Sequence, residues 1–238
     1  MVMCRQRLTM VTAALVLAVG SPARTELVAQ GQTAPAATSL PSSDDAASAI
    51  LKQSPFHAEW INVFVGPGRP PLRTYIVHPV RKTLGPVIIV VPDNRGMTDW
   101  ARAVGHQFAK AGYTTMVADL LSGLGPNEGN SESFASMEDR ARALGQLSHD
   151  ETMRRLQAAW DFGFRLPAVN GKLATVGFGW GAGPSVEFAL AQPALNAVVA
   201  FDAAAPPPPA SKTPILALKA GDEQAWSKTL TFLMQHAD

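Results

Sequence analysis

Short apolar runs alternate with amphipathic segments along the chain from about residue 56 onward. Each run is predominantly apolar, which is typical of parallel strands that are buried on both faces of a sheet. The expected strands are Pro86–Val91, Thr114–Ala118, Leu173–Phe178, Asn196–Phe201 and Ile215–Leu218. The segments between and after them have helical spacing and predict helices at Asp99–Ala111, Ser136–Leu147, His149–Phe164, Ala182–Ala191 and Asp222–His236. This alternation predicts an α/β fold with a doubly wound, mostly parallel sheet and helices on both faces.

Three other segments depart from this alternation. Glu59–Val65 and Leu72–Val80 are joined by a turn rich in glycine and proline, and they predict an antiparallel hairpin at the start of the sheet. Leu121–Phe134 is rich in glycine and serine and is long for a loop in a compact domain, and such loops are often functional. Pro206–Pro209 predicts a rigid connector between the last two strands.

The N-terminus has the pattern of a targeting segment. Two arginines precede the apolar run Leu8–Val19, and Ser21-Pro22-Ala23 places small residues at the cleavage positions. We therefore expect a signal peptide at residues 1–23 and an exported protein, periplasmic or secreted, with no integral membrane span after cleavage. The alternative is an uncleaved membrane anchor, although the run is shorter than the roughly 20 residues that span a bilayer. Cys4 is the only cysteine, so cleavage would leave a mature chain without a thiol.

Residues 24–55 have the composition of a flexible tether. They are rich in alanine, serine, threonine and proline, with only one helical turn indicated, near Ala46–Leu51. The folded domain is expected to span residues 56–238. With 47% hydrophobic residues and a net charge of +1, the chain can form a sizeable core and shows no charge pattern for a nucleic-acid partner. No cofactor and no metal site is predicted, and the sequence gives no indication of oligomeric state.

The segment Lys172–Gly183 is the centre of the candidate chemistry. An expected strand ends in Gly177-Phe178-Gly179-Trp180-Gly181, and an expected helix follows. Strand, sharp turn and helix form the context of a nucleophile elbow, G-x-Nuc-x-G, in which the residues two places from the nucleophile must lack side chains. Both flanking glycines are present, but the nucleophile position is occupied by Gly179, which has no side chain to react.

The same glycines also fit a dinucleotide-binding fingerprint. Gly177-x-Gly179-x-x-Ala182 follows an expected strand, and Asp202 ends the next strand, where an acid that binds ribose would lie. Close packing without any ligand is a third explanation of such a turn. Two arguments weigh against the dinucleotide: the fingerprint usually follows the first strand of a sheet, and an exported protein would meet little NAD.

Several motifs, taken together and in order, resemble the dienelactone hydrolase family of α/β-hydrolases from about Phe56 to the C-terminus. They are Glu59-Trp60, Pro92-Asp93-Asn94-Arg95-Gly96, Asp119-Leu120-Leu121-Ser122-Gly123, Asn170-Gly171-Lys172 and Gly177-Phe178-Gly179-Trp180-Gly181. The resemblance implies an α/β-hydrolase-like sheet, here truncated at its C-terminal edge, and activity on lactones and small esters. It further implies a cysteine nucleophile assisted by an aspartate and a histidine.

Carried over by position, the resemblance assigns a role to five residues. Gly179 occupies the nucleophile position, and Asp222 would be the acid. Asp93 stands where the family has an acidic residue that supports the nucleophile. The backbone N–H groups of Asn94 and Trp180 would form the oxyanion hole, a role that does not depend on the side chain. No catalytic set is therefore intact.

The histidine of the family lies beyond a further helix and strand that this chain does not show. His236 is the only histidine after Asp222, and we expect it on the surface at a helix end. Ser122 and Ser185 are other candidates for attack, with Ser122 nearer the expected cleft, but a structural role is the better interpretation of both. Asp93 and Arg95 leave open a local ion pair or a role in the cleft.

Two hypotheses follow. The first is a catalytically impaired family member that binds small carboxylates or esters without turnover, or the product of a decayed gene. The second is an active ester hydrolase that uses an unrecognised serine or a histidine supplied by a partner.

Overall fold

The computed structural model describes residues 39–204 and 211–237. Within them a seven-stranded sheet has the order β1-β2-β4-β3-β5-β6-β7. The strands are β1 (Ala58–Val63), β2 (Leu72–Val77), β3 (Gly85–Val91), β4 (Thr114–Ala118), β5 (Val169–Phe178), β6 (Ala197–Phe201) and β7 (Ile215–Leu218). β1 pairs with β2 and β2 with β4 in antiparallel fashion, and all other pairs are parallel. The predicted hairpin and the mostly parallel sheet are therefore present.

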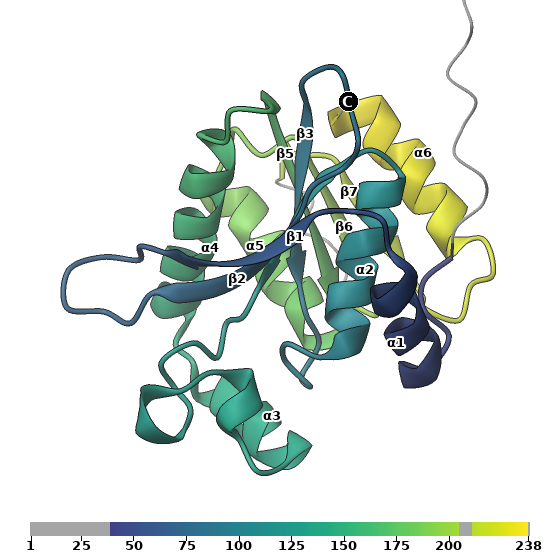
Figure 1. Ribbon diagram of the computed structural model, residues 1–238. Coiled ribbons are helices and arrows are strands. Elements are labelled where there is room, and N and C mark those ends of the chain that lie inside the picture. The colour runs from purple at the N-terminus through teal and green to yellow at the C-terminus, as the bar shows by residue number, and fades with distance from the viewer. Residues whose placement is uncertain (1–38, 205–210, 238) are drawn as a thin grey trace, which may run out of the picture. The chain divides into compact units, whose positions relative to one another are not determined.

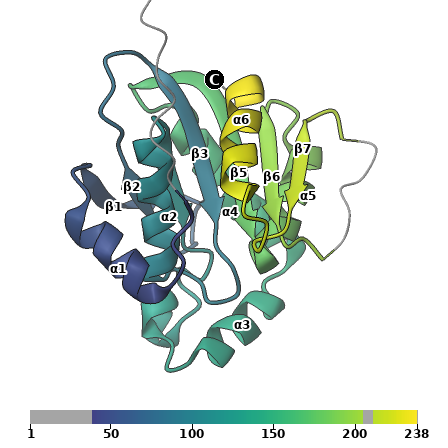
Figure 2. The same ribbon diagram turned by 90° about the vertical axis from the view of Figure 1, so that its right-hand side faces the viewer.

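Six α-helices are described: α1 (Asp44–Gln53), α2 (Asp99–Lys110), α3 (Met137–Gln146), α4 (His149–Phe164), α5 (Ala182–Ala191) and α6 (Ala225–Ala237). α2 and α6 cover one face of the sheet and α4 and α5 cover the other (Figures 1 and 2). This arrangement confirms the predicted doubly wound α/β fold. Within the described residues, no helix is both long enough and apolar enough to cross a membrane.

The central strand β3 shows why the sheet forms two cores. All seven of its residues are buried. Successive side chains of a strand point to opposite faces. Val87, Ile89 and Val91 accordingly join the core beneath α4 and α5, whereas Ile88 and Val90 join the core beneath α2 and α6.

The structure differs from the sequence prediction in the segment before residue 56. We expected a flexible tether there, but residues 44–53 form α1, which packs against α2. The side chain of Ser43 caps the helix by accepting from the amide of Ala46, and Ala47 is fully buried. Residues 24–38 of the predicted tether, the predicted signal peptide and Pro206–Pro209 lie outside the described residues.

The long loop between β4 and α3 is ordered by one buried carboxylate. Asp119 accepts from the amide of Leu121 at 3.1 Å and from the amide and hydroxyl of Ser131 at 3.0 and 2.5 Å. Burial raises the pKa of Asp119, and the bonds from Ser131 oppose that shift. The Ser131 hydroxyl in turn accepts from the amide of Met97 at 3.0 Å. The loop is thereby connected to the segment that follows β3.

Candidate functional site

The site is built around the turn between β5 and α5. β5 ends at Phe178, residues 179–181 form one 3₁₀ turn, and α5 begins at Ala182. Gly179 has a φ of +50°, in the left-handed region that side-chain-bearing residues rarely occupy. Strand, turn and helix thus follow in the predicted order, with the strained position at residue 179.

The two flanking glycines are required by backbone packing. A Cβ atom on Gly177 would lie 2.3 Å from the carbonyl oxygen of Gly181. A Cβ atom on Gly181 would lie 2.4 Å from the carbonyl oxygens of Val91 and Pro92. Gly179 is different, because its only neighbour within 4 Å would be the Cβ of Asp93, at 3.4 Å. The nucleophile position therefore has room for a side chain and is limited only by its backbone angles.

Gly179 opens into a cleft of about 650 Å³ at the carboxyl ends of the strands. Ligands of open α/β sheets bind at this edge. The lining residues come from the start of α1 and the two residues before it, from the loop after β3, from α2, from the elbow and from the segments that follow β6 and β7. They are Ser42, Ser43, Asp44, Asp93, Asn94, Arg95, Trp100, Phe178, Gly179, Asp202 and Ala220.

Asp93 and Arg95 form an ion pair inside this cleft. Asp93 accepts from the backbone amide of Arg95 at 2.9 Å and from its guanidinium at 3.0 Å. Arg95 also lies 3.7 Å from the carboxylate of Asp44. The sequence left two roles open for Asp93 and Arg95, a local ion pair and a place in the cleft. Both occur together in the structure.

The two expected oxyanion donors come from different segments, the loop after β3 and the turn after β5. Asn94 lines the cleft, and Trp180 follows Gly179 in the turn that leads into α5. The first N–H groups of a helix have no partner within it and attract negative charge. The indole of Trp180 lies in a separate small cavity beside Leu121 and Leu144. The Trp180 side chain therefore lines that cavity rather than the cleft.

Asp222, the predicted acid, is engaged elsewhere. Its carboxylate accepts from the amide of Gln224 at 2.9 Å and from the ammonium of Lys228 at 2.7 Å. The hydrogen bond from Lys228 and that from Gln224 lower the pKa of Asp222. The residue is not among those that line the cleft. Its geometry is that of an Asx turn in the segment just before α6.

His236 is at the far end of α6 from the cleft. α6 begins after β7 ends, at the carboxyl edge of the sheet, and the C-terminus lies at the opposite edge, near the start of β3 (Figures 1 and 2). The His236 ring packs on Phe232 with a centroid separation of 4.6 Å. The structure therefore does not bring His236 together with Gly179.

The two candidate serines are buried and hydrogen-bonded to backbone. Ser122 donates to the carbonyl of Asp119 at 2.6 Å and accepts from the amide of Arg73 at 2.9 Å. Ser185 donates to the carbonyl of Gly181 at 2.8 Å. Neither lines the cleft. We had placed Ser122 nearer the cleft, and its contacts are those of a structural serine.

The sequence analysis missed the wall of the cleft that α1 supplies. The carbonyl of Pro41 accepts from the indole Nε1 of Trp100 at 2.9 Å, and Ser54 is hydrogen-bonded to Nδ1 of His106 at 2.5 Å. The segment from Pro41 to Ser54 is therefore attached to α2 at both ends. Ser43 followed by two aspartates is a helix-start signal, and it could have indicated this helix.

Asp202, the candidate ribose-binding acid, also lines the cleft. It follows the last residue of β6 with a φ of +53° and accepts from the amide of Ala220 at 3.3 Å. Of the two fingerprint glycines, however, Gly177 packs against the backbone of Gly181, and the motif follows β5, a middle strand of the sheet. Close packing accounts for Gly177, so this glycine gives no support to a dinucleotide.

Comparison with known proteins gives a consistent set of relatives. A model of the dienelactone hydrolase family matches residues 72–226. YghX of Escherichia coli (strain K12), named as a hydrolase fragment, is 33% identical over 90 residues, which are 37% of this chain and 71% of that fragment.

Two solved structures have the same fold. The dienelactone hydrolase-like promiscuous phosphotriesterase P91, from metagenomic libraries, is 22% identical with a TM-score of 0.57, over 76% of this chain and 75% of its own. The dienelactone hydrolase of Anabaena variabilis is 16% identical with a TM-score of 0.54, over 77% of this chain and 99% of its own.

Proposed function

This chain belongs to the dienelactone hydrolase family, and we propose that it is a catalytically impaired member whose cleft binds a small ester or related carboxyl compound without turning it over. The observation that carries the proposal is Gly179. It occupies the strained position of the elbow, with a φ of +50°, and has no atom that could attack a carbonyl.

The rest of the catalytic set is also missing from the cleft. No histidine is among the residues that line it, and Asp222 is paired with Lys228. Loss of a nucleophile or its base commonly lowers kcat by about 10⁴ to 10⁶, and the residual rate comes from the oxyanion hole and binding. Backbone N–H groups do not depend on a side chain, so loss of the nucleophile would leave those of Asn94 and Trp180, which favours retained binding over retained chemistry.

The charges of the cleft favour a neutral ester over a free carboxylate. Asp93 and Arg95 neutralise each other at 3.0 Å. The two remaining carboxylates, Asp44 and Asp202, are partly exposed and would repel an anion. The rings of Trp100 and Phe178, in edge-on contact at 5.0 Å, offer an apolar surface to the body of the ligand.

Hydrolysis of p-nitrophenyl acetate and of dienelactone by the purified chain tests the impairment. We expect negligible turnover of both. Turnover within tenfold of an active family member would overturn the proposal. If a Ser122→Ala change then abolished that turnover, the active site would be the alternative one that uses a serine.

Calorimetric titration with methyl benzoate and with benzoate tests the binding. We expect saturable binding of the ester and weaker binding of the anion. Ala220→Trp places a large ring at the cleft wall and should abolish binding, whereas Ala217→Trp, exposed on β7 outside the cleft, should not. Absence of saturable binding below about 1 mM, which is about 4.1 kcal/mol, would contradict retained recognition.

We further propose that the mature protein is exported, because residues 1–23 have the signal-peptide pattern. Mass spectrometry of protein expressed with its own N-terminus tests this. A mature chain that begins after residue 23 is expected, and a full-length cytoplasmic product would contradict it.

A further inference from the structure

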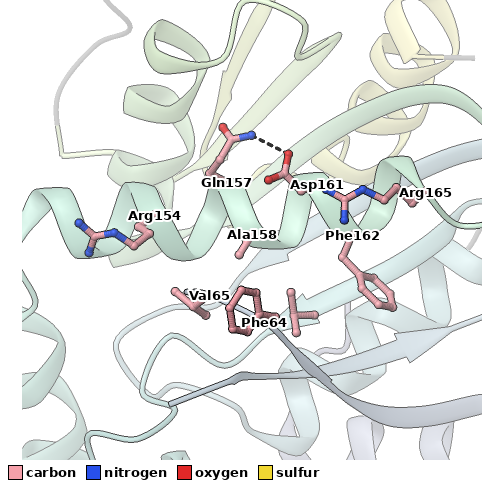
Figure 3. Close-up of a pocket in the computed structure, with 9 residues that line it drawn as sticks. Phe64, Val65, Arg154, Gln157, Ala158, Asp161, Phe162 and Arg165 are labelled. Atoms are coloured by element: carbon pink, nitrogen blue, oxygen red, sulfur yellow. Dashed lines mark hydrogen bonds between the residues drawn. The ribbon is translucent and has the colours of Figure 1, made fainter. Parts of the chain in front are cut away.

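A second concave site lies between the hairpin of β1 and β2 and helix α4 (Figure 3). Its volume is about 350 Å³, within the range of small-molecule sites. It shares no lining residue with the cleft at Gly179. The proposed function does not account for it.

The floor of this groove is apolar and includes one unusually exposed ring. Val63 and Val65 are buried, whereas Phe64 between them is 73% exposed. Phe162 of α4 lies across from Phe64 in the same groove (Figure 3). Covering a phenylalanine side chain is worth about 1.5–3 kcal/mol. A ligand that covers both rings would therefore gain from their burial.

The walls of the groove carry an excess of positive charge. Arg154 shares the carboxylate of Glu151 with Arg69 and Arg155, so three guanidinium groups surround one acid. Arg165 follows the last turn of α4 and, among residues 39–204 and 211–237, forms no ion pair. The remaining acid, Asp161, accepts from Gln157 at 3.0 Å. Taken together, the charged groups along the groove favour the binding of an anion.

We propose that this groove binds an amphiphilic anion, a medium-chain carboxylate with its hydrocarbon body on Phe64 and Phe162 and its head group at Arg165. The guanidinium provides paired donors that match the two oxygens of a carboxylate. An apolar body with one fixed polar contact is the usual composition of a small-molecule site. This site is separate from the proposed ester cleft and does not depend on it.

Calorimetric titration with decanoate tests the site, with decanol as the uncharged match. We expect one saturable decanoate site per chain and at least tenfold weaker binding of decanol. Arg165→Gln and Phe64→Ser should each weaken decanoate binding about tenfold, and Arg165→Lys less than that. Arg142→Gln, which removes an exposed arginine on α3, is the matched control and should leave binding unchanged.

Three outcomes would overturn the proposal. The first is no saturable binding of decanoate below 1 mM, and the second is binding that neither Arg165→Gln nor Phe64→Ser alters. The third is loss of decanoate binding in Ala220→Trp, because the anion would then occupy the cleft at Gly179. All the variants change exposed positions, and a thermal melt of each would verify folding. Ala220→Trp changes the ester cleft and Arg165→Gln changes the groove beside α4. Failure of the decanoate proposal can therefore be told apart from failure of the ester-binding proposal.

Discussion

The carboxylate of Asp222 lies 2.7 Å from the ammonium group of Lys228, six residues further along the chain. This pairing links the segment after β7 to helix α6. In an enzyme of this family the acid at that position would orient a histidine, as the resemblance implies. Here the same carboxylate pairs with a lysine of α6.

We predict that Asp222→Asn leaves ester binding in the cleft unchanged and lowers the melting temperature slightly. Because the pKa of Asp222 is lowered in the fold, its contribution is present above the usual pKa and is lost as the pH falls through the folded value. Thermal melts at neutral and strongly acidic pH would show the difference between variant and parent disappearing in acid. A tenfold loss of methyl benzoate binding would instead place Asp222 in the site.

We predict that Gly179→Cys restores the side chain of the family without restoring catalysis. The positive φ of the position should cost on the order of 1 kcal/mol. A thiol near its ordinary pKa of about 8.5 is ionised by only a few per cent at neutral pH and here lacks a base. Thermal melts and an ester assay measure both effects, and Gly179→Ala is the control for strain alone. Efficient hydrolysis by the cysteine variant would reveal an unrecognised base, and a higher melting temperature would refute the strained elbow.

We predict a much larger loss of stability at the flanking glycines. Gly177→Ala and Gly181→Ala each place a Cβ within 2.4 Å of backbone oxygen atoms, so the strand and helix must separate. Each change should lower the free energy of unfolding by several kcal/mol, which is the size of effect that strained or overpacked positions produce. Gly183→Ala is the control, because its Cβ meets nothing within 4 Å and alanine favours the helix by about 0.5–1 kcal/mol. Urea unfolding of the three variants tests the order, and equal effects would contradict it.

We predict that His106 makes the fold sensitive to acid. Burial, helped by the nearby Arg102, lowers the pKa of His106 to about 4. A histidine with a lowered folded pKa stabilises the protein fully above its unfolded pKa of about 6.5, and this contribution is lost as the pH falls toward 4. Since one pKa unit corresponds to about 1.36 kcal/mol, we expect an effect on the order of 1–3 kcal/mol.

His106→Gln should flatten the pH dependence of stability between pH 4 and 6.5. Urea unfolding at several pH values measures the slope. His149→Gln is the control, because His149 is exposed and its pairing with Glu187 lies on the surface. An unchanged slope in the His106 variant would mean that another group controls acid unfolding.

The fold was largely predictable because its signals are local. Continuous apolar runs such as Pro86–Val91 identify buried strands, and their alternation with helices leaves few topologies. The elbow was predictable for the same reason, since its glycines stand together in one short motif between a strand and a helix. The part of the cleft wall that α1 forms was harder to predict, because the segment has the composition of a linker. Its attachment to α2 depends on partners that are distant in the sequence, Trp100 and His106. The pairing of Asp222 with Lys228 was likewise invisible until the helix and its side chains were placed.

The contacts of Gly177 and Gly181 have an evolutionary consequence. The shape of the turn is maintained by these two residues, which pack against the backbone at the end of β3 and within the turn itself, and not by the residue between them. A lineage can therefore lose its nucleophile by mutation at codon 179 and still inherit an intact scaffold. Selection can then act on ligand binding alone, and residue 179 can later acquire a new reactive side chain.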